Sequence, residues 1–481
     1  MADTETPKKK KAGAFHPRIM EGRRFITSDE TEITAVNVVR VLTAVESSHL
    51  ANSTDIDYLW NYYKGRQPIL GRKKSVRPEI CNKVVENRAN EIVSFKLGYL
   101  CGEPIQYISR GAEDNIADGI SKLNEFMALE HKASFDREIV EWQLICGTSF
   151  RMVLPDKDSD EDEVPFEIYT LDPRYTFVVY NNGIGNKPLM GVTYTIDRSG
   201  VKSYSVYTNN EFFEIRAGAV ISHRDNPLGM IPIIEYPANN ARLGAFEIVL
   251  PLLDALNTTV SNRLDGVEQF VQSFVKFINC DVSEDDFIAL KELGAIKVKS
   301  IDGQAADVAI VTNELNQTQT QTLTDDLYQS VLTICGIPNR NGGSSTSDTG
   351  AAVIMRDGWS LAEARAKDSE LMFKKSEGQF LRLVLRILRD IGDISLKLSD
   401  IDIRFTRRNY ENIQSKSQVL VSMLQEPKIH PLLAFTHSGL FIDSESAYQM
   451  SMEYYEAEKA KADATEEIKE ESVANGDVPL I

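Results

Sequence analysis

Residues 339–358 bring Gly, Ser, Thr, Asn and Asp together in one short stretch, NRNGGSSTSDTGAAVIMRDG, ahead of a helical pattern. A Gly-rich loop that leads into a helix can hold phosphate through its backbone N–H groups. The phosphate loop of nucleotide hydrolases needs G-x-x-x-x-G-K-[ST]. Here Ser344 follows Gly343, no lysine is near, and a predicted helix precedes the loop instead of a strand. Nucleotide binding is therefore the least favoured interpretation, and a plain flexible loop and a mobile loop with a functional position both remain open.

A second candidate is the acidic stretch DKDSDEDEVPFE at residues 156–167. Asp156, Asp158, Asp160 and Glu167 occupy positions one, three, five and twelve of a calcium loop. Position six is Glu161, where that loop needs glycine for its turn, and the flanking patterns indicate strands. An acidic hairpin tip is therefore favoured over a metal site.

A third candidate is a basic loop beside Tyr62 and Tyr63, and its cations are Lys64, Arg66, Arg72, Lys73, Lys74 and Arg77. Basic and aromatic residues together can grip nucleic acid. The loop is short and the chain is acidic, so a surface loop or a subunit contact is favoured.

No pattern of catalytic or metal-ligating residues emerges. The six histidines show no HExxH motif, no GxSxG elbow is present, and no pair of carboxylates stands out as a catalytic dyad. The five cysteines form no CxxC pair and are typical of free thiols: Cys81, Cys101, Cys146, Cys280 and Cys335. We expect no enzyme activity, no catalytic residue, no metal and no cofactor.

The length and the net charge of the chain limit the number of domains and the kinds of function that it can have. The chain has 481 residues, enough for two to four modules at about 100–200 residues each. Acidic residues outnumber basic ones by 71 to 53, which gives a net charge of −18. That charge argues against a protein that coats DNA, but not against one that lets DNA slide past. The first residues lack the apolar segment of a secretory leader, and no apolar run of about 18 residues predicts a membrane span.

The elements that carry these stretches are mainly helical. Residues 28–150 show helical spacing, whereas residues 149–236 alternate as short strands of an antiparallel sheet. The fold class is therefore α+β, mainly α. A long helical run covers about 350–391, with SDTG as its N-cap and Gly358 and Gly378 as bends. Two strands and the helices of 411–460 follow, and both chain ends are expected to be disordered.

Two further helices are predicted to bracket a small insert. The first covers residues 243–278, the insert 280–313 has a short helix and two strands, and the second helix covers 315–336. The first helix has an apolar stripe and a polar stripe, so it can pack on neighbours and present a wet face to a pore. The polar stripe consists of Asn257, Ser261, Asp265, Glu268, Gln272 and Lys276.

Several segments together resemble the portal protein of tailed double-stranded-DNA bacteriophages, of the siphophage type. They are YYKGRQPIL, NRANEIVSFKLGYLCGEPIQY, DPRYTFVVYNN, NPLGMIPIIEYPANNARLGAFEIVLPLLDALNTTVSNRLDGVEQF and TSDTGAAVIMRDGWSLAEARAKDSE. They follow the order of that family and cover about 50–455. The resemblance rests on their number and order, since none is a catalytic motif.

The resemblance implies an architecture. It assigns 1–27 to an N-terminal tail, 28–242 to the wing, 243–278 and 315–336 to two stem helices, 279–314 to the clip, 337–350 to a tunnel loop, 351–407 to a long helix and strands of the wing, 408–460 to the crown and 461–481 to an acidic tail.

The resemblance also implies a function and partners. The family forms a ring, typically of twelve subunits, at one capsid vertex of the virion, and double-stranded DNA enters and leaves through it. The partners implied are the terminase large subunit, head-completion or adaptor proteins, and the major capsid and scaffolding proteins, with assembly in the host cytoplasm and no membrane.

Candidate channel residues follow from the same resemblance. In the tunnel loop they are Asn339, Arg340, Asn341, Gly342, Gly343, Ser344, Ser345, Thr346, Ser347 and Asp348. In the stem they are the six residues of the polar stripe, and in the clip they are Lys297 and Lys299. Two alternatives remain open: a packaging ATPase or nuclease subunit, and a capsid adaptor without a channel.

Overall fold

The computed structural model describes residues 20–110, 114–156, 164–271, 274–278, 280–281, 299–300, 307–311, 317–339, 358–392, 396–407, 413–441 and 443–474. The chain divides into two compact units. Unit 1 contains residues 58–92 and 246–335, and unit 2 contains residues 21–57, 93–245 and 336–481. Helices α1 (Val38–Tyr63) and α2 (Arg88–Leu100) each run from one unit into the other.

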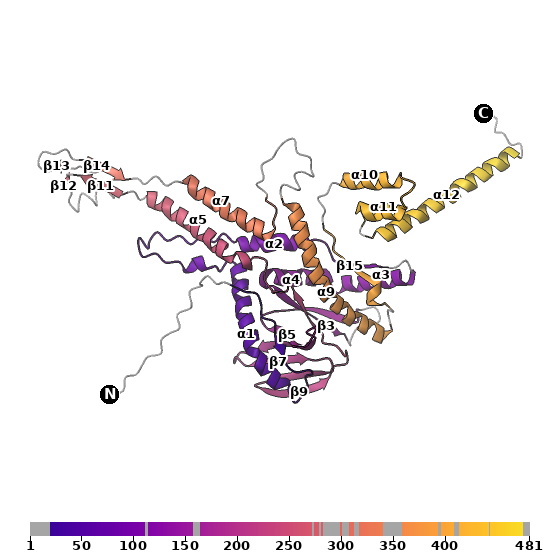
Figure 1. Ribbon diagram of the computed structural model, residues 1–481, viewed down its shortest axis with the longest axis horizontal. Helices are drawn as coiled ribbons and strands as arrows, with labels where there is room; N and C mark the ends of the chain where they lie inside the picture. The colour runs from indigo at the N-terminus through magenta and orange to yellow at the C-terminus, as the bar shows by residue number, and fades with distance from the viewer. Residues whose placement is uncertain are drawn as a thin grey trace. The chain divides into compact units, whose positions relative to one another are not determined.

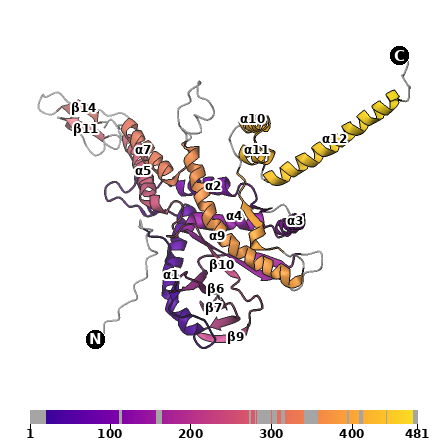
Figure 2. The same ribbon diagram turned by 45° about the vertical axis from the view of Figure 1, so that its right-hand side comes forward.

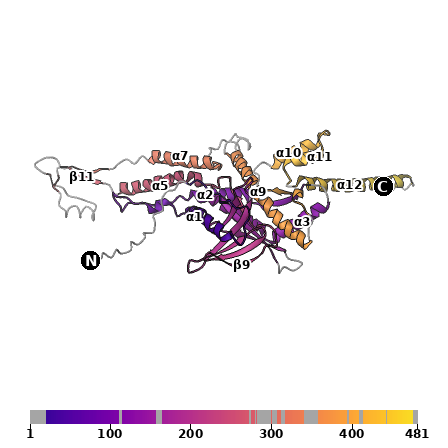
Figure 3. The same ribbon diagram turned by 60° about the horizontal axis from the view of Figure 1, so that its bottom comes forward.

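The larger sheet of unit 2 has six strands in the order β1-β5-β6-β7-β8-β9, with β9 at one edge (Figure 3). Its strands are β1 (Thr27–Ser28), β5 (Thr176–Asn181), β6 (Pro188–Ile196), β7 (Lys202–Tyr207), β8 (Glu211–Arg216) and β9 (Ala219–Asp225). Only β1 pairs in parallel, with β5, and the other pairs are antiparallel. Val38, Val41 and Leu42 of α1 pack in one core with Phe177 and Val192 of the sheet.

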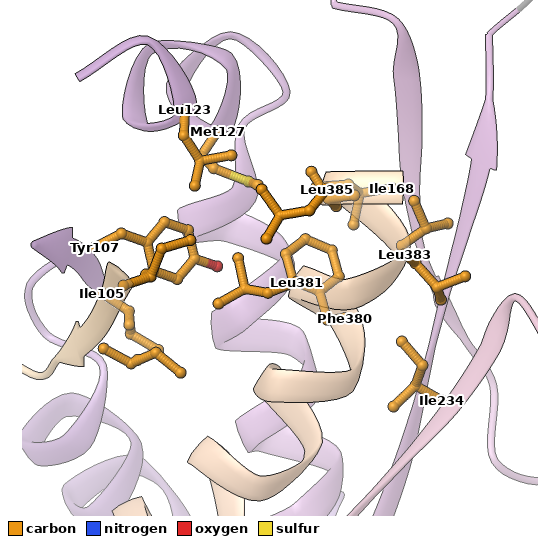
Figure 4. Packing of buried hydrophobic residues seen from close by; sticks show 14 of the residues in the cluster. Ile105, Tyr107, Leu123, Met127, Ile168, Ile234, Phe380, Leu381, Leu383 and Leu385 are labelled. Carbon is orange, nitrogen blue, oxygen red and sulfur yellow. The ribbon is translucent and has the colours of Figure 1, made fainter. Parts of the chain in front are cut away.

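A second core of unit 2 surrounds a three-stranded sheet, β10-β3-β4, made of β3 (Thr148–Pro155), β4 (Phe166–Leu171) and β10 (Ile233–Pro237). Helices α3 (Asp114–Leu129), α4 (Lys132–Cys146) and α9 (Trp359–Ile391) pack around it. The short pair β2 (Gln106–Ser109) and β15 (Ile401–Arg404), which follows the turn η3 (Leu398–Asp400), joins the same core. In Figure 4, Phe380 and Leu381 of α9 lie between Tyr107, Leu123 and Ile234.

A buried ionic cluster ties α9 to α4 and β3. Lys132 and Asp136 lie on α4, Arg151 on β3 and Glu377 on α9, and each side chain is at most 3% exposed. Lys132 Nζ lies 2.6 Å from Asp136 Oδ2 and 2.7 Å from Glu377 Oε1. Arg151 lies 2.5 Å from Asp136 Oδ1 and 3.1 Å from Glu377 Oε2. Two cations therefore face two carboxylates, and the cluster is neutral.

Two tyrosines complete the shell around Glu377. The hydroxyls of Tyr107 and Tyr236 donate to its carboxylate over 2.6 and 2.7 Å. Burial alone would raise the pKa of Glu377, but Lys132 and Arg151 hold that pKa well below its ordinary value. The carboxylate is therefore charged at neutral pH, and it fixes the middle of α9 against the second core.

Three helices follow in the last part of unit 2: α10 (Ile413–Leu424), α11 (Pro431–Ser438) and α12 (Ser444–Ala474). His430 caps α11, with Pro431 at its first position, and Gly439 ends it in the left-handed region. Figure 2 shows α12 as one rod that extends beyond α10 and α11.

Unit 1 is built on two antiparallel helices, α5 (Leu250–Val271) and α7 (Gln317–Cys335), which run side by side in Figure 1. Two short turns, η1 (Pro68–Gly71) and η2 (Glu247–Val249), pack on α5. The chain between the two helices forms two strand pairs, which Figure 1 shows beyond their far ends. Strand β11 (Phe274–Ile278) pairs with β14 (Asp307–Val311), and β12 (Cys280–Asp281) pairs with β13 (Lys299–Ser300), both antiparallel.

The α+β, mainly helical class is confirmed, but several boundaries differ from the prediction. The helix predicted over 243–278 ends at Val271, and residues 274–278 form β11, because the run FVKFI is β-branched and aromatic and pairs with DVAIV. Helix α9 continues through Gly378, and Gly358 is its left-handed N-cap and so lies before the helix rather than within it. The SDTG cap and the short helix predicted around SEDDFIALKELG, residues 283–294, lie outside the described residues.

The disordered N-terminal tail predicted over residues 1–27 includes residues that are part of the fold. Ile26 is buried among the residues that cover the six-stranded sheet, and Thr27 and Ser28 pair with β5. The acidic stretch 156–167 is flanked by the antiparallel strands β3 and β4, which confirms the hairpin, while residues 157–163 lie outside the described residues.

Candidate functional site

A ladder of three side chains on α5 holds an extended segment of unit 1, residues 82–86. Asn257, Ser261 and Asp265 lie four residues apart and so repeat every ~6 Å along one face of the helix. Alternate residues of an extended chain repeat every ~6.6 Å and point the same way. The two repeats match closely enough for three bonds: Glu86 N to Asn257 Oδ1 at 2.8 Å, Val84 N to Ser261 Oγ at 3.0 Å and Asn82 N to Asp265 Oδ1 at 2.7 Å.

Asp265 is the most strongly bonded member of the ladder. Besides the Asn82 backbone it accepts from Asn82 Nδ2 at 2.9 Å, and it pairs with Arg72 at 2.9 Å and Lys74 at 3.0 Å. Burial alone would raise the pKa of Asp265, but the Asn82 N–H and the two cations lower it below its ordinary value. Two cations of the predicted basic loop therefore bind α5 of their own chain.

Asn257 and Asp254 secure the other end of the ladder. Asn257 also donates to the buried amide of Gln67. The Tyr62 hydroxyl donates to Asp254 over 3.0 Å, and the Tyr62 ring stacks on Phe246 with ring centroids 5.9 Å apart. Burial raises the pKa of Asp254 to about 6, although the Tyr62 bond opposes the rise.

Because its pKa is raised by burial, the ionised Asp254 lowers the free energy of unfolding at neutral pH. Since its folded pKa exceeds the ordinary value of 3.8, its contribution is favourable below pH 3.8 and is lost as the pH rises through about 6. Asp254→Asn keeps an acceptor for Tyr62 and removes the charge. We expect a gain of about 1–2 kcal/mol in unfolding free energy at pH 8, after allowance for solvent screening. The gain should vanish by pH 4, as measured by denaturant titration at both values, and a gain independent of pH would contradict this assignment.

The exposed surfaces of helices α5 and α7 carry no lysine or arginine. Helix α7 contains no lysine or arginine, and Arg263, the single basic residue of α5, is half-buried and donates to Gln321. The exposed residues of α5 up to 268 are Pro251, Thr258, Asn262, Leu264, Val267 and Glu268. Those of α7 are Thr318, Gln319, Gln321, Thr322, Leu323, Asp325, Asp326, Ser330, Thr333 and Ile334.

The predicted stem residues divide into two groups. Asn257, Ser261 and Asp265 are at most 3% exposed, so the prediction that they form an open wet face is wrong for these three. Their face is covered by residues 82–86 of the same chain. Glu268 is exposed, as predicted for the stripe.

The remaining candidates are only partly placed. Lys276 lies on β11 opposite Ala309, not on a helix, and Lys299 lies on β13 opposite Asp281. Gln272, Lys297 and residues 340–348 lie outside the described residues. Asn339 is described and half-buried.

The two sides of segment 340–357 come together in unit 2. A Cβ built on Gly358 would lie 3.8 Å from the Cα of Pro338, so the described residues on the two sides of the segment lie close together. Gly358 has φ of 84° and Gly336 has φ of 67°, both in the left-handed region that favours glycine. The Trp359 ring then lies 6.0 Å from the rings of both Phe95 and Tyr99.

The described residues were also searched for a metal-binding cluster. Among the described residues no group of three or more His, Cys, Asp or Glu side chains could hold a metal ion. A search of the same residues for a helix both long enough and apolar enough to cross a membrane finds none.

Comparison with known proteins assigns the family. A family model described as "Phage portal protein, SPP1 Gp6-like" matches residues 43–472. The chain belongs to this family of phage portal proteins. No curated protein matches the chain. A chain of the solved structure titled "Neck of empty GTA particle computed with C6 symmetry" is similar over 74% of this chain and 90% of its own length, at 10% identity and a TM-score of 0.44.

Membership of a portal family makes this a structural component of a virion and implies a symmetric oligomeric ring in a phage head. For this portal protein, sequence reasoning missed the partners of the ladder. Spacings of four between Asn257, Ser261 and Asp265 signal one polar face, but nothing in the sequence indicates that residues 82–86 cover it.

Proposed function

We propose that this portal protein forms a ring at one capsid vertex with a central channel through which double-stranded DNA is packaged and ejected. The observation that carries the proposal is the α5–α7 pair without exposed cations. Each phosphate neutralised by a protein cation releases counterions and adds affinity, which must be overcome at every step of a moving duplex. The exposed side chains of the two helices are Thr, Gln, Asn, Ser and acidic residues with a few apolar ones, and none of them attracts phosphate, which offers low friction.

Within this proposal, α5 and α7 are the stem that lines the channel, with the first stem helix shortened to residues 250–271. The strand pairs between them belong to the clip, which meets the terminase motor and later the head-completion proteins. Residues 28–242 and 351–407 are the wing, and α10 to α12 belong to the crown inside the capsid. Contacts with the major capsid and scaffolding proteins complete the set of partners.

The direct test is the assembled particle. Purified protein examined by negative-stain microscopy and mass photometry should give a ring with a through-hole and a mass many times the 53.9 kDa of one subunit. A ring closed at its centre would favour an adaptor without a channel. ATP hydrolysis by the purified protein alone would favour a packaging enzyme.

A deletion tests the proposed tunnel loop. Removing residues 341–347 should leave ring yield unchanged, because Pro338 and Gly358, where the two sides of the segment lie close together, are retained. Packaging of DNA into proheads by the terminase should fall at least tenfold. Normal packaging with the shortened loop would remove the support for this assignment.

A further inference from the structure

The outer side of α9 carries a basic ridge, defined as Lys375, Arg382, Arg386 and Arg389. All four side chains are exposed. Their spacings of seven, four and three residues place them along one side of the helix. At 1.5 Å per residue the ridge is ~21 Å long.

The ridge is largely uncompensated within the chain. Arg386 lies 3.4 Å from Asp390, and both side chains are about half exposed, so this pair is screened by solvent. In the part of the chain that the structure describes, no carboxylate lies within ion-pair distance of Lys375, Arg382 or Arg389. Such a line of unneutralised cations is unusual in a chain with a net charge of −18.

The opposite side of the same helix fixes the ridge in place. Phe380, Val384 and Leu388 are fully buried in the second core, and Glu377 is held by the buried ionic cluster. A ridge on so firmly packed a helix is organised before any partner binds, which lowers the entropy lost on binding.

The ridge continues toward the start of α9 as an apolar surface. Leu371, four residues before Lys375, is 69% exposed, and Leu361 is 42% exposed on the same side. Exposed leucine beside arginine is typical of a protein interface, whereas DNA-binding surfaces are more uniformly polar and basic. The composition therefore favours a protein partner with an acidic surface.

We propose that the basic ridge of α9 binds the acidic surface of a second copy of this chain. The inference rests on the proposed ring. In a ring, each contact joins two different surfaces of neighbouring copies. Identical subunits of charge −18 repel one another, and a contact that sets cations of one copy against carboxylates of the next offsets that repulsion.

The experiment compares charge reversals in the full-length chain. Arg382→Glu with Arg386→Glu should lower the fraction of protein in rings at least tenfold by mass photometry in 0.1 M salt. The matched control reverses two exposed cations on turns of the six-stranded sheet, Lys187→Glu with Arg198→Glu, and should assemble as the unchanged protein does. Arg382→Lys with Arg386→Lys keeps the charge and should assemble normally.

Thermal unfolding of the monomer fractions, followed by circular dichroism, distinguishes a defect in assembly from a defect in folding. The ridge reversal and the control reversal should have the same melting temperature. Normal ring yield in the ridge reversal would overturn the inference while leaving the ring itself intact. Retained rings with at least tenfold weaker binding to a labelled 30-base-pair duplex would overturn it in favour of DNA. If the unchanged protein forms no ring, the proposed function fails, and the inference fails with it.

Discussion

Replacing Glu377 with glutamine should lower the unfolding free energy of this portal protein by about 3–5 kcal/mol, the usual cost of removing one partner from a buried ionic cluster. Glu377 faces Lys132 and Arg151, and its side chain is fully buried. Glutamine fills the same space but leaves the two cations with Asp136 alone. One buried positive charge is then left without a partner, far from water.

Denaturant titration at pH 7 measures this loss, and Asp368→Asn, at an exposed position of the same helix, is the matched control. The sign of the pH dependence is fixed by the lowered pKa of Glu377. Its stabilisation is complete above the ordinary value of 4.5 and is lost as the pH falls through the folded value. The difference between the two proteins should therefore shrink below pH 4. A loss under 1 kcal/mol at pH 7 would show that the cluster is not what fixes α9.

Asp265→Ala should have the second largest effect, a loss of about 2–3 kcal/mol, centred on one segment. The change removes the acceptor of the Asn82 N–H and leaves Arg72 and Lys74 without their shared carboxylate. These cations are 15% and 27% exposed, so water takes over part of the lost interaction. Release of residues 72–86 from α5 is the expected structural result.

Two measurements locate this effect. Hydrogen exchange at the amides of Asn82 and Val84 should become at least tenfold faster, and trypsin should cut first after Arg72, Lys73 or Lys74. Glu268→Gln, which changes an exposed carboxylate on the same helix, should alter neither. Unchanged protection in Asp265→Ala would show that the ladder contributes little to holding the segment.

Much of the helical framework could be predicted because its signals are local. The helix predicted over 315–336 is α7, Gln317–Cys335, since Leu323, Leu327 and Val331 repeat at helical spacing and Gly336 stops the run. The strand at 274–278 was harder to predict. Phe274 and Ile278 continue the stripe of α5 at helical spacing, and only pairing with Val311 and Asp307 makes this segment a strand.

The polar contacts could not be predicted because their partners are distant in sequence. Asn257, Ser261 and Asp265 were recognised as one face, but the backbone N–H groups that they bind lie 171 to 183 residues away. A polar helix face that is exposed to solvent and one that hydrogen-bonds to another segment of the same chain contain the same types of residue, so the sequence does not distinguish them. Glu377 was missed for a similar reason. A glutamate in a helix with many charged residues is expected to be exposed, and only the tertiary structure shows that it pairs with Arg151 of β3.

The ladder on α5 also has an evolutionary consequence. Its three acceptors bind backbone N–H groups of residues 82–86, which every amino acid except proline supplies. The side chain of Lys83 is exposed and takes no part in these bonds, so we expect it to vary freely among relatives. A single inserted or deleted residue would turn alternate N–H groups to the wrong side and break the match with the helix. Selection should preserve the length of this segment more strictly than its sequence.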